Sequence, residues 1–339
     1  MGGGNWSAST YAGSTGKKIA SGSAFIYDTA MHGASRYDRK AHEDLDPKKV
    51  AGPTSVFVGQ TVRESRDNDE HPNSVPIVTI FDATGSMGNV PRIVQKKLAD
   101  LFGLLLRKGY VEDPQIMIGA YGDAYCDVVP LQISQFESDN RIDENLDKLF
   151  LEGGGGGNQG ETQSLAWYYL AYHTATDSFE KRGKKGYAFF VADEKVLDLT
   201  PQHVKEYIGD GEPLGKLDTK SLAKAVSDKW DVYILLINNW TAQMQRSEEF
   251  YKKLFGDKHV LIVEDENSIT ETIALSIGVL EGTIDIDEGV DDLEAIGSGT
   301  VAVHSAVSAV SGLRDLAGTG AVAKGEALDI SGDSGAARL

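Results

Sequence analysis

The sequence has one cysteine, no long apolar run and no excess of basic residues, and each absence argues against a class of protein. The single cysteine, Cys126, cannot form an intramolecular disulfide. That fits a reducing compartment, so we expect a cytoplasmic protein. No run reaches the roughly 18 consecutive apolar residues that a transmembrane helix needs. The first residues lack the basic region and apolar core of a signal peptide. We therefore expect a soluble chain.

The balance of charge is acidic, with 33 Lys and Arg residues against 51 Asp and Glu residues, and the formal net charge is −18. Nucleic acids and anionic membranes bind basic surfaces, so we expect neither as a main partner. No Ser-His-Asp or Cys-His arrangement stands out, and the seven histidines have no metal-ligand spacing. The hydrophobic content of 41% is that of an ordinary globular protein.

One stretch, from Val75 to Met87, combines a strand signal with candidate ligands. Residues 75–81 are apolar and rich in β-branched side chains, which predicts a buried strand. Asp82, Thr84 and Ser86 follow at alternate positions, and residues 91–106 then have the apolar spacing of a helix. Ligands of open α/β sheets bind at the carboxyl ends of strands. Asp-x-Thr-x-Ser there offers only oxygen ligands, which suit Mg²⁺ and, less specifically, Mn²⁺ or Ca²⁺.

This stretch and the helix behind it resemble the first motif of a von Willebrand factor A (vWA) domain. In that family the motif Asp-x-Ser-x-Ser forms a metal-ion-dependent adhesion site (MIDAS), and here Thr84 replaces the first serine. The resemblance implies that a partner's carboxylate completes the coordination of the metal. It also implies a second ligand loop and a third, acidic motif.

The second loop follows a run of glycines at residues 153–157, which would let the backbone approach a ligand closely. The family's second motif is a Thr in a loop before a helix, and Thr162 is the nearest hydroxyl, with Asn158 and Glu161 as rivals. The third motif is an Asp at the end of a strand, which Asp193 matches after the apolar run 186–192. Asp123 also follows an apolar run, 115–121, and is either a turn residue or part of the site.

Further strands are predicted at 127–133, 231–238 and 259–263, and helices at 144–151, 164–172, 219–229, 247–255 and 268–280. This alternation predicts an α/β fold with a mostly parallel central sheet and helices on both faces. The resemblance makes it a Rossmann-like vWA fold over residues 75–282. Residues 1–74 are expected to be a partly packed N-terminal extension. Residues 283–339 are expected to be an acidic linker and a Gly-, Ala- and Ser-rich tail, in which 301–316 could form a weak helix.

We therefore expect a non-catalytic, metal-dependent module that binds an acidic group of a protein partner. Its metal ligands would be Asp82, Thr84, Ser86, Thr162 and Asp193. The alternative is a Mg²⁺-dependent phosphoryl-transfer enzyme, because Asp82 to Ser86 is also similar to the nucleophile loop of haloacid-dehalogenase-like phosphatases. In that case Asp82 is the nucleophile, Asp193 and Asp198 imitate the late acidic motif, and Lys184 or Lys185 supplies the required lysine. The sequence identifies neither the partner nor the metal.

Overall fold

The structure is a computed structural model that describes residues 7, 26–49, 62–154, 160–238 and 241–317. Its centre is a six-stranded sheet with the order β4-β3-β2-β6-β7-β8, in which only β4 is antiparallel to its neighbour. The strands are β2 (Val75–Asp82), β3 (Pro114–Tyr121), β4 (Leu131–Ile133), β6 (Gly186–Ala192), β7 (Trp230–Ile237) and β8 (Val260–Val263). The predicted mixed α/β fold with a mostly parallel sheet is thus confirmed.

Strand β2 lies in the middle of the sheet and pairs with β3 on one side and β6 on the other. All eight of its residues are buried, which explains its continuous apolar sequence. Alternate side chains of β2 enter two separate cores: Ile77 and Phe81 in one, Val78 and Ile80 in the other. The strand ends therefore hold a fixed position inside the protein.

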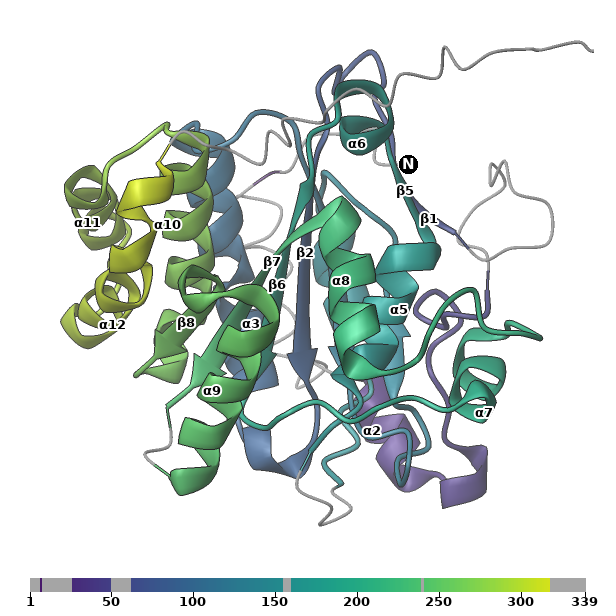
Figure 1. Cartoon of the computed structure of the whole chain (residues 1–339). Helices are drawn as coiled ribbons and strands as arrows, with labels where there is room; N and C mark the ends of the chain where they lie inside the picture. Colours follow the sequence, from purple (N-terminus) through teal and green to yellow (C-terminus); the bar gives the residue numbers. More distant parts are fainter. Residues whose placement is uncertain (1–6, 8–25, 50–61, 155–159, 239–240, 318–339) are drawn as a thin grey trace, which may run out of the picture.

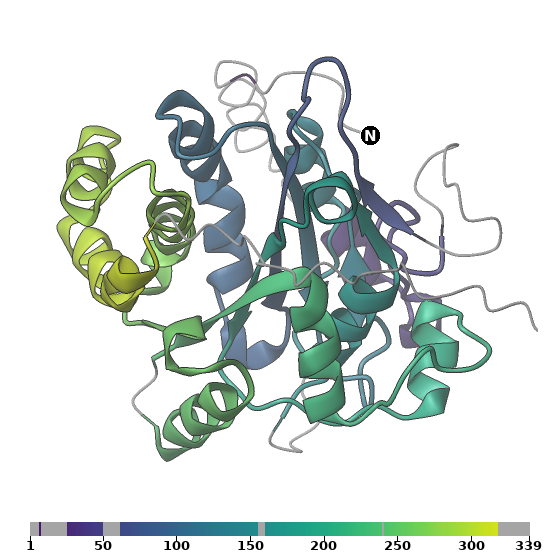
Figure 2. The same ribbon diagram turned by 45° about the horizontal axis from the view of Figure 1, so that its top comes forward.

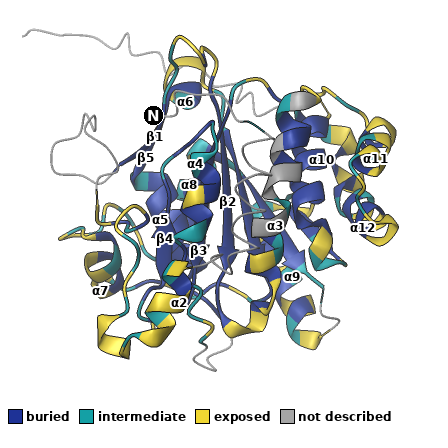
Figure 3. Cartoon of the chain, turned by 180° about the vertical axis from the view of Figure 1, so that it is seen from behind, coloured by how far each residue is buried: buried dark blue, intermediate teal, exposed yellow. Residues whose placement is uncertain are grey.

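Helices cover both faces of the sheet (Figures 1 and 2). The core around Ile77 includes α3 (Val90–Phe102) and α10 (Ile269–Glu281). The core around Val78 includes α5 (Gln163–Tyr172), α8 (Thr219–Lys229) and α9 (Ala242–Phe255). The residues coloured as buried in Figure 3 include the strands of this sheet and parts of the helices that pack on it. Short helices α4 (Arg141–Asp147), α6 (Asp177–Arg182) and α7 (Pro201–His203) lie in the connections.

Several boundaries differ from those expected. The strand expected at 127–133 is reduced to β4, and the helix expected at 144–151 is α4, which starts and ends earlier. Helix α9 begins at Ala242 rather than 247 because the Thr241 side chain caps it by accepting a hydrogen bond from the Met244 N–H. Among the described residues, no helix has the length and apolar character needed to cross a bilayer.

The described part of the N-terminal extension packs on the domain through α2 (Ile26–Gly33) and β1 (Arg63–Ser65). Strand β1 pairs in parallel with β5 (Thr174–Thr176) in a separate two-stranded sheet. Arg63 is fully buried, and its guanidinium donates to the carbonyls of Lys49, Asp46 and Ile133 at 2.7, 3.1 and 3.2 Å. This arginine ties the extension to the end of β4.

The stretch after residue 283 contains two helices that pack on the domain: α11 (Ile286–Ala295) and α12 (Thr300–Val310). Helix α12 and the 3₁₀ helix Ser311–Leu316 that follows it match the weak helix predicted at 301–316, whereas α11 lies where a linker is expected. Helices α11 and α12 both belong to the core that includes α10, where Leu293 and Val310 are completely buried. Acidic side chains separate the few apolar residues of α11, so the local composition resembles a linker. The apolar surface of α10 supplies the partner that makes the helix stable.

We expect Leu293→Ala to lower the free energy of unfolding by about 2–5 kcal/mol, because it leaves a cavity between α11 and α10. Val301→Ala is the control, since Val301 lies on the neighbouring helix and is 71% exposed. Urea unfolding would measure both variants. Equal, small losses would mean that α11 does not contribute to the core.

Candidate metal centre

Asp82 and Asp193 lie at the carboxyl ends of two neighbouring strands. Asp82 is the last residue of β2, and Asp193 directly follows β6. From β2 the chain continues to β3 and β4 on one side of the sheet, then crosses to β6 on the other side. The strand order therefore reverses between β2 and β6, the position where open α/β sheets bind their ligands.

The loop after β2 links the two acids through hydroxyl groups. The Thr84 N–H donates to Asp82 Oδ1 at 2.7 Å, and the Thr84 side chain also hydrogen-bonds to that carboxylate. The Thr84 and Ser86 hydroxyl oxygens are 3.0 Å apart, and the Ser86 side chain hydrogen-bonds to Asp193. The structure thus brings together four of the five predicted ligands: Asp82, Thr84, Ser86 and Asp193.

Each of the two acids keeps one buried oxygen without a hydrogen-bond partner, Asp82 Oδ2 and Asp193 Oδ1. Asp82 is completely buried, and burial together with the Asp193 charge raises its pKa to about 8. Burial also raises the pKa of Asp193, against the lowering effect of the Ser86 hydrogen bond. A bound cation would offset this repulsion and supply the missing partner, so the residues fit a metal ion.

The start of the glycine run lies directly against this loop. The Gly85 N–H donates to Gly154 O at 2.8 Å, and the Gly153 N–H donates to Ala83 O at 3.2 Å. A Cβ atom at Gly85 would lie 2.9 Å from Gly153 O, so the two backbones approach too closely for a side chain there. Residues 155–159, with the rival ligand Asn158, lie outside the described part of the chain.

The fifth predicted ligand, Thr162, forms hydrogen bonds with the loop after β3 instead. Its hydroxyl donates to Gly122 O at 2.9 Å and accepts from the Ala124 N–H at 2.7 Å, so it holds the loop after β3. Its neighbour Glu161 is buried, and Glu161 Oε2 has no hydrogen-bond partner. Burial, then the charge of Asp82 and those of other nearby acids, raises the pKa of Glu161 to about 10.

Asp123 is buried at the end of β3 and forms a turn. Its Oδ1 accepts a hydrogen bond from the Tyr125 N–H at 3.0 Å, and Cys126 Sγ donates to its Oδ2 at 3.4 Å. Of the two interpretations that the sequence leaves open, these contacts favour the turn residue.

One residue near the centre, Tyr251, has no signal in the sequence. Tyr251, on α9, donates its hydroxyl hydrogen toward Gln163 Oε1 at 2.6 Å and Glu194 O at 2.9 Å. Burial, and then the charges of Asp82 and Asp193, raises the pKa of Tyr251. Nothing local in the sequence marks Tyr251, because only the packing of α9 brings it to the loops that follow β6.

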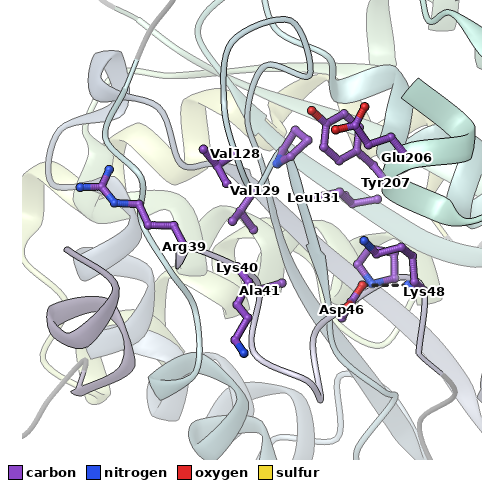
Figure 4. Close-up of a pocket in the computed structure, with 12 residues that line it drawn as sticks. Arg39, Lys40, Ala41, Asp46, Lys48, Val128, Val129, Leu131, Glu206 and Tyr207 are labelled. Carbon is purple, nitrogen blue, oxygen red and sulfur yellow. Dashed lines mark hydrogen bonds between the residues drawn. The ribbon is translucent and has the colours of Figure 1, made fainter. Parts of the chain in front are cut away.

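Within the described residues, no group of three or more His, Cys, Asp or Glu side chains is placed to hold a metal. The predicted centre is not such a group, because only two of its four ligands are carboxylates and the other two are the hydroxyls of Thr84 and Ser86. A cleft of about 180 Å³, shown in Figure 4, is a separate feature. Its lining includes Lys40, Lys48, Val129 and Tyr207 but none of the predicted ligands.

The lysines of the phosphoryl-transfer alternative lie at the opposite end of the sheet. Lys184 and Lys185 precede β6, whereas Asp193 follows it, and a seven-residue strand spans roughly 20 Å. Lys184 Nζ pairs with Glu281 at 2.6 Å, and Lys185 Nζ donates to Ser227 O at 2.6 Å. A helix, α3, also follows the Asp82 loop directly. This geometry disfavours a haloacid-dehalogenase-like site.

No protein-family model matches the chain, and no curated protein matches it. Among solved structures, the pilus adhesin SpaC from Lactobacillus rhamnosus GG is 11% identical with a TM-score of 0.44, over 64% of this chain and 32% of the adhesin. Proximal thread matrix protein 1 from the mussel byssus is 11% identical with a TM-score of 0.41, over 60% of this chain and 47% of that protein. The chain thus matches less than half the length of either, and at this degree of likeness we draw nothing about function from them.

The raised pKa of Asp82 predicts how stability depends on pH without metal. Between its ordinary value of 3.8 and about 8, the folded protein holds a proton that the unfolded chain releases. The free energy of unfolding contributed by Asp82 therefore falls as pH rises through this range. Asp82→Asn should lack this fall, so it should gain stability relative to wild type between about pH 5 and about pH 8.

Urea unfolding in EDTA at the two pH values would test this, with Asp228→Asn as the control. Asp228 lies on α8, and its side chain is 63% exposed. A difference between Asp82→Asn and wild type that does not change with pH would contradict the raised pKa of Asp82.

Proposed function

We propose that this chain is a metal-dependent protein-interaction module of the vWA type, which binds an acidic group of a partner through a MIDAS-like centre. The observation that carries the proposal is the pair of buried carboxylates, Asp82 and Asp193, each with an oxygen that lacks a partner. The hydroxyls of Thr84 and Ser86 connect them.

The sheet supports the vWA part of the proposal. Counted along the chain, its six strands lie in the order 3-2-1-4-5-6, the doubly wound order of Rossmann-like folds. The third strand, β4, is the antiparallel edge strand. The Asp82 loop leads into α3 at the reversal of this order, as the proposed centre requires.

The residues that would hold the ion are Asp82, Thr84, Ser86 and Asp193. A bound Mg²⁺ would supply a positive centre that a partner's carboxylate can coordinate, because Mg²⁺ takes oxygen ligands and usually keeps some water that can be exchanged. Thr84 keeps the hydroxyl that the family motif provides through Ser. Its 5% exposure leaves the added methyl group packed inside the protein.

We expect Asp82→Ala to abolish the binding of Mg²⁺ and Mn²⁺, because it removes the central carboxylate. Isothermal titration calorimetry would measure this. Asp228→Ala, which removes an exposed acid from α8, should bind like wild type. Unchanged binding by Asp82→Ala would refute the centre. A metal-dependent phosphatase turnover lost in Asp82→Asn would instead favour the enzyme alternative.

Partner binding should require both the ion and the Thr84 hydroxyl. The probe is an array of acidic peptides, each matched by a copy in which Asn or Gln replaces the acid. We expect the acidic copies to bind in Mg²⁺ and to be lost in EDTA. Thr84→Ser should retain binding, whereas Thr84→Val, which has nearly the same shape, should lose it. Equal binding in EDTA, or by the amide copies, would show that a different surface is used.

A further inference from the structure

Two rival residues, Glu161 and Thr162, follow the glycine run, and their hydrogen bonds distinguish them. The Thr162 hydroxyl gives its one proton to Gly122 O and accepts from the Ala124 N–H. Both bonds are buried, and both hold the loop after β3. A metal would have to compete with them for the Thr162 oxygen.

Hydrogen bonds fix the backbone of Glu161, whereas one oxygen of its carboxylate has no hydrogen-bond partner. Its N–H donates to Lys195 O at 3.1 Å, and its carbonyl accepts from the Leu197 N–H at 2.9 Å, which places it beside the segment that follows Asp193. The residue is 7% exposed, yet Glu161 Oε2 has no hydrogen-bond partner. Among the nearby charges, that of Asp82 raises the pKa of Glu161 most. A buried oxygen that has no hydrogen-bond partner points to a missing cation or water.

We propose that Glu161, rather than Thr162, is the residue that this loop contributes to the metal centre, and that its carboxylate accepts a hydrogen bond from a water on the ion. This inference rests on the proposed function. We assign the carboxylate to a water rather than to the ion because no three acidic side chains among the described residues are placed to hold a metal together. Mg²⁺ commonly keeps several waters, so such a position exists.

A third carboxylate near the ion changes what the centre recognises. With Asp82 and Asp193 it places three acidic groups at the site, so the metal-free site offers an acidic partner no positive charge. The ion is then held more tightly, because outer partners of metal ligands contribute substantially to metal affinity. The partner's carboxylate is accepted only when the ion is present.

Calorimetric titration with Mn²⁺ tests the assignment. Glu161→Gln, which keeps the shape, should weaken Mn²⁺ affinity by about 10–100-fold. Thr162→Val should melt at a lower temperature, since it leaves the loop after β3 without two hydrogen bonds, but should bind Mn²⁺ with wild-type affinity. Glu206→Gln is the charge control, because Glu206 is an exposed acid that lines the separate cleft of Figure 4.

Thermal unfolding provides a second readout that a purely structural role would not reproduce. In EDTA, Glu161→Gln should melt at or above the wild-type temperature, because it removes a buried acid whose Oε2 has no hydrogen-bond partner. In Mn²⁺, wild type should gain more than the variant, since it binds the ion more tightly. A structural Glu161 would instead lower the melting temperature equally in both solutions.

Two results would overturn the assignment while leaving the proposed function intact. One is wild-type Mn²⁺ affinity in Glu161→Gln, and the other is loss of Mn²⁺ binding in a folded Thr162→Val. Asp82→Asn must lose Mn²⁺ in the same experiment. If wild type itself binds no Mn²⁺, the proposed function fails and this inference fails with it.

Discussion

The repulsion between two buried carboxylates at the centre of the sheet is the constraint on which the site depends. Asp82 is completely buried, and its neighbour Asp193 raises its pKa further. Burying like charges without a counter-charge costs several kcal/mol. The fold sustains this cost because β2 and β6 are adjacent and buried along their whole length. The two strands therefore hold their ends in place whether or not the acids are neutralised.

Hydrogen bonds from both the backbone and side chains tie the loops around these acids to one another. Gly85 and Gly153 bring the first loop and the glycine run together. Thr162 holds the loop after β3, and Glu161 holds the loop after β6. Loops from three neighbouring strands thus meet at the carboxyl ends of these strands, where Asp82 Oδ2, Asp193 Oδ1 and Glu161 Oε2 have no hydrogen-bond partner. Such preorganisation leaves the oxygens free for a ligand.

Much of the sheet could be predicted because a strand buried on both faces needs a continuous apolar run. Residues 186–192 match β6, and the strand predicted at 75–81 matches β2 to within one residue. The loop ligand could not be predicted in the same way. Thr162 and Glu161 are neighbours with equally suitable oxygens, and only the hydrogen bonds to Gly122 and Ala124 distinguish them. The packing of α11 could not be predicted either, because its own sequence is rich in acidic residues and the apolar surface that it packs on belongs to α10.

The acidity of the chain and the proposed recognition of an acidic partner are compatible only if the ion is present. With a net charge of −18, the protein repels an acidic group at long range, and salt screens this beyond about 10 Å. At the centre itself, Asp82, Asp193 and Glu161 offer a partner's carboxylate no positive charge. A divalent cation would supply that charge while the rest of the surface stays acidic. Recognition would then be confined to one position, and the availability of the metal would control it.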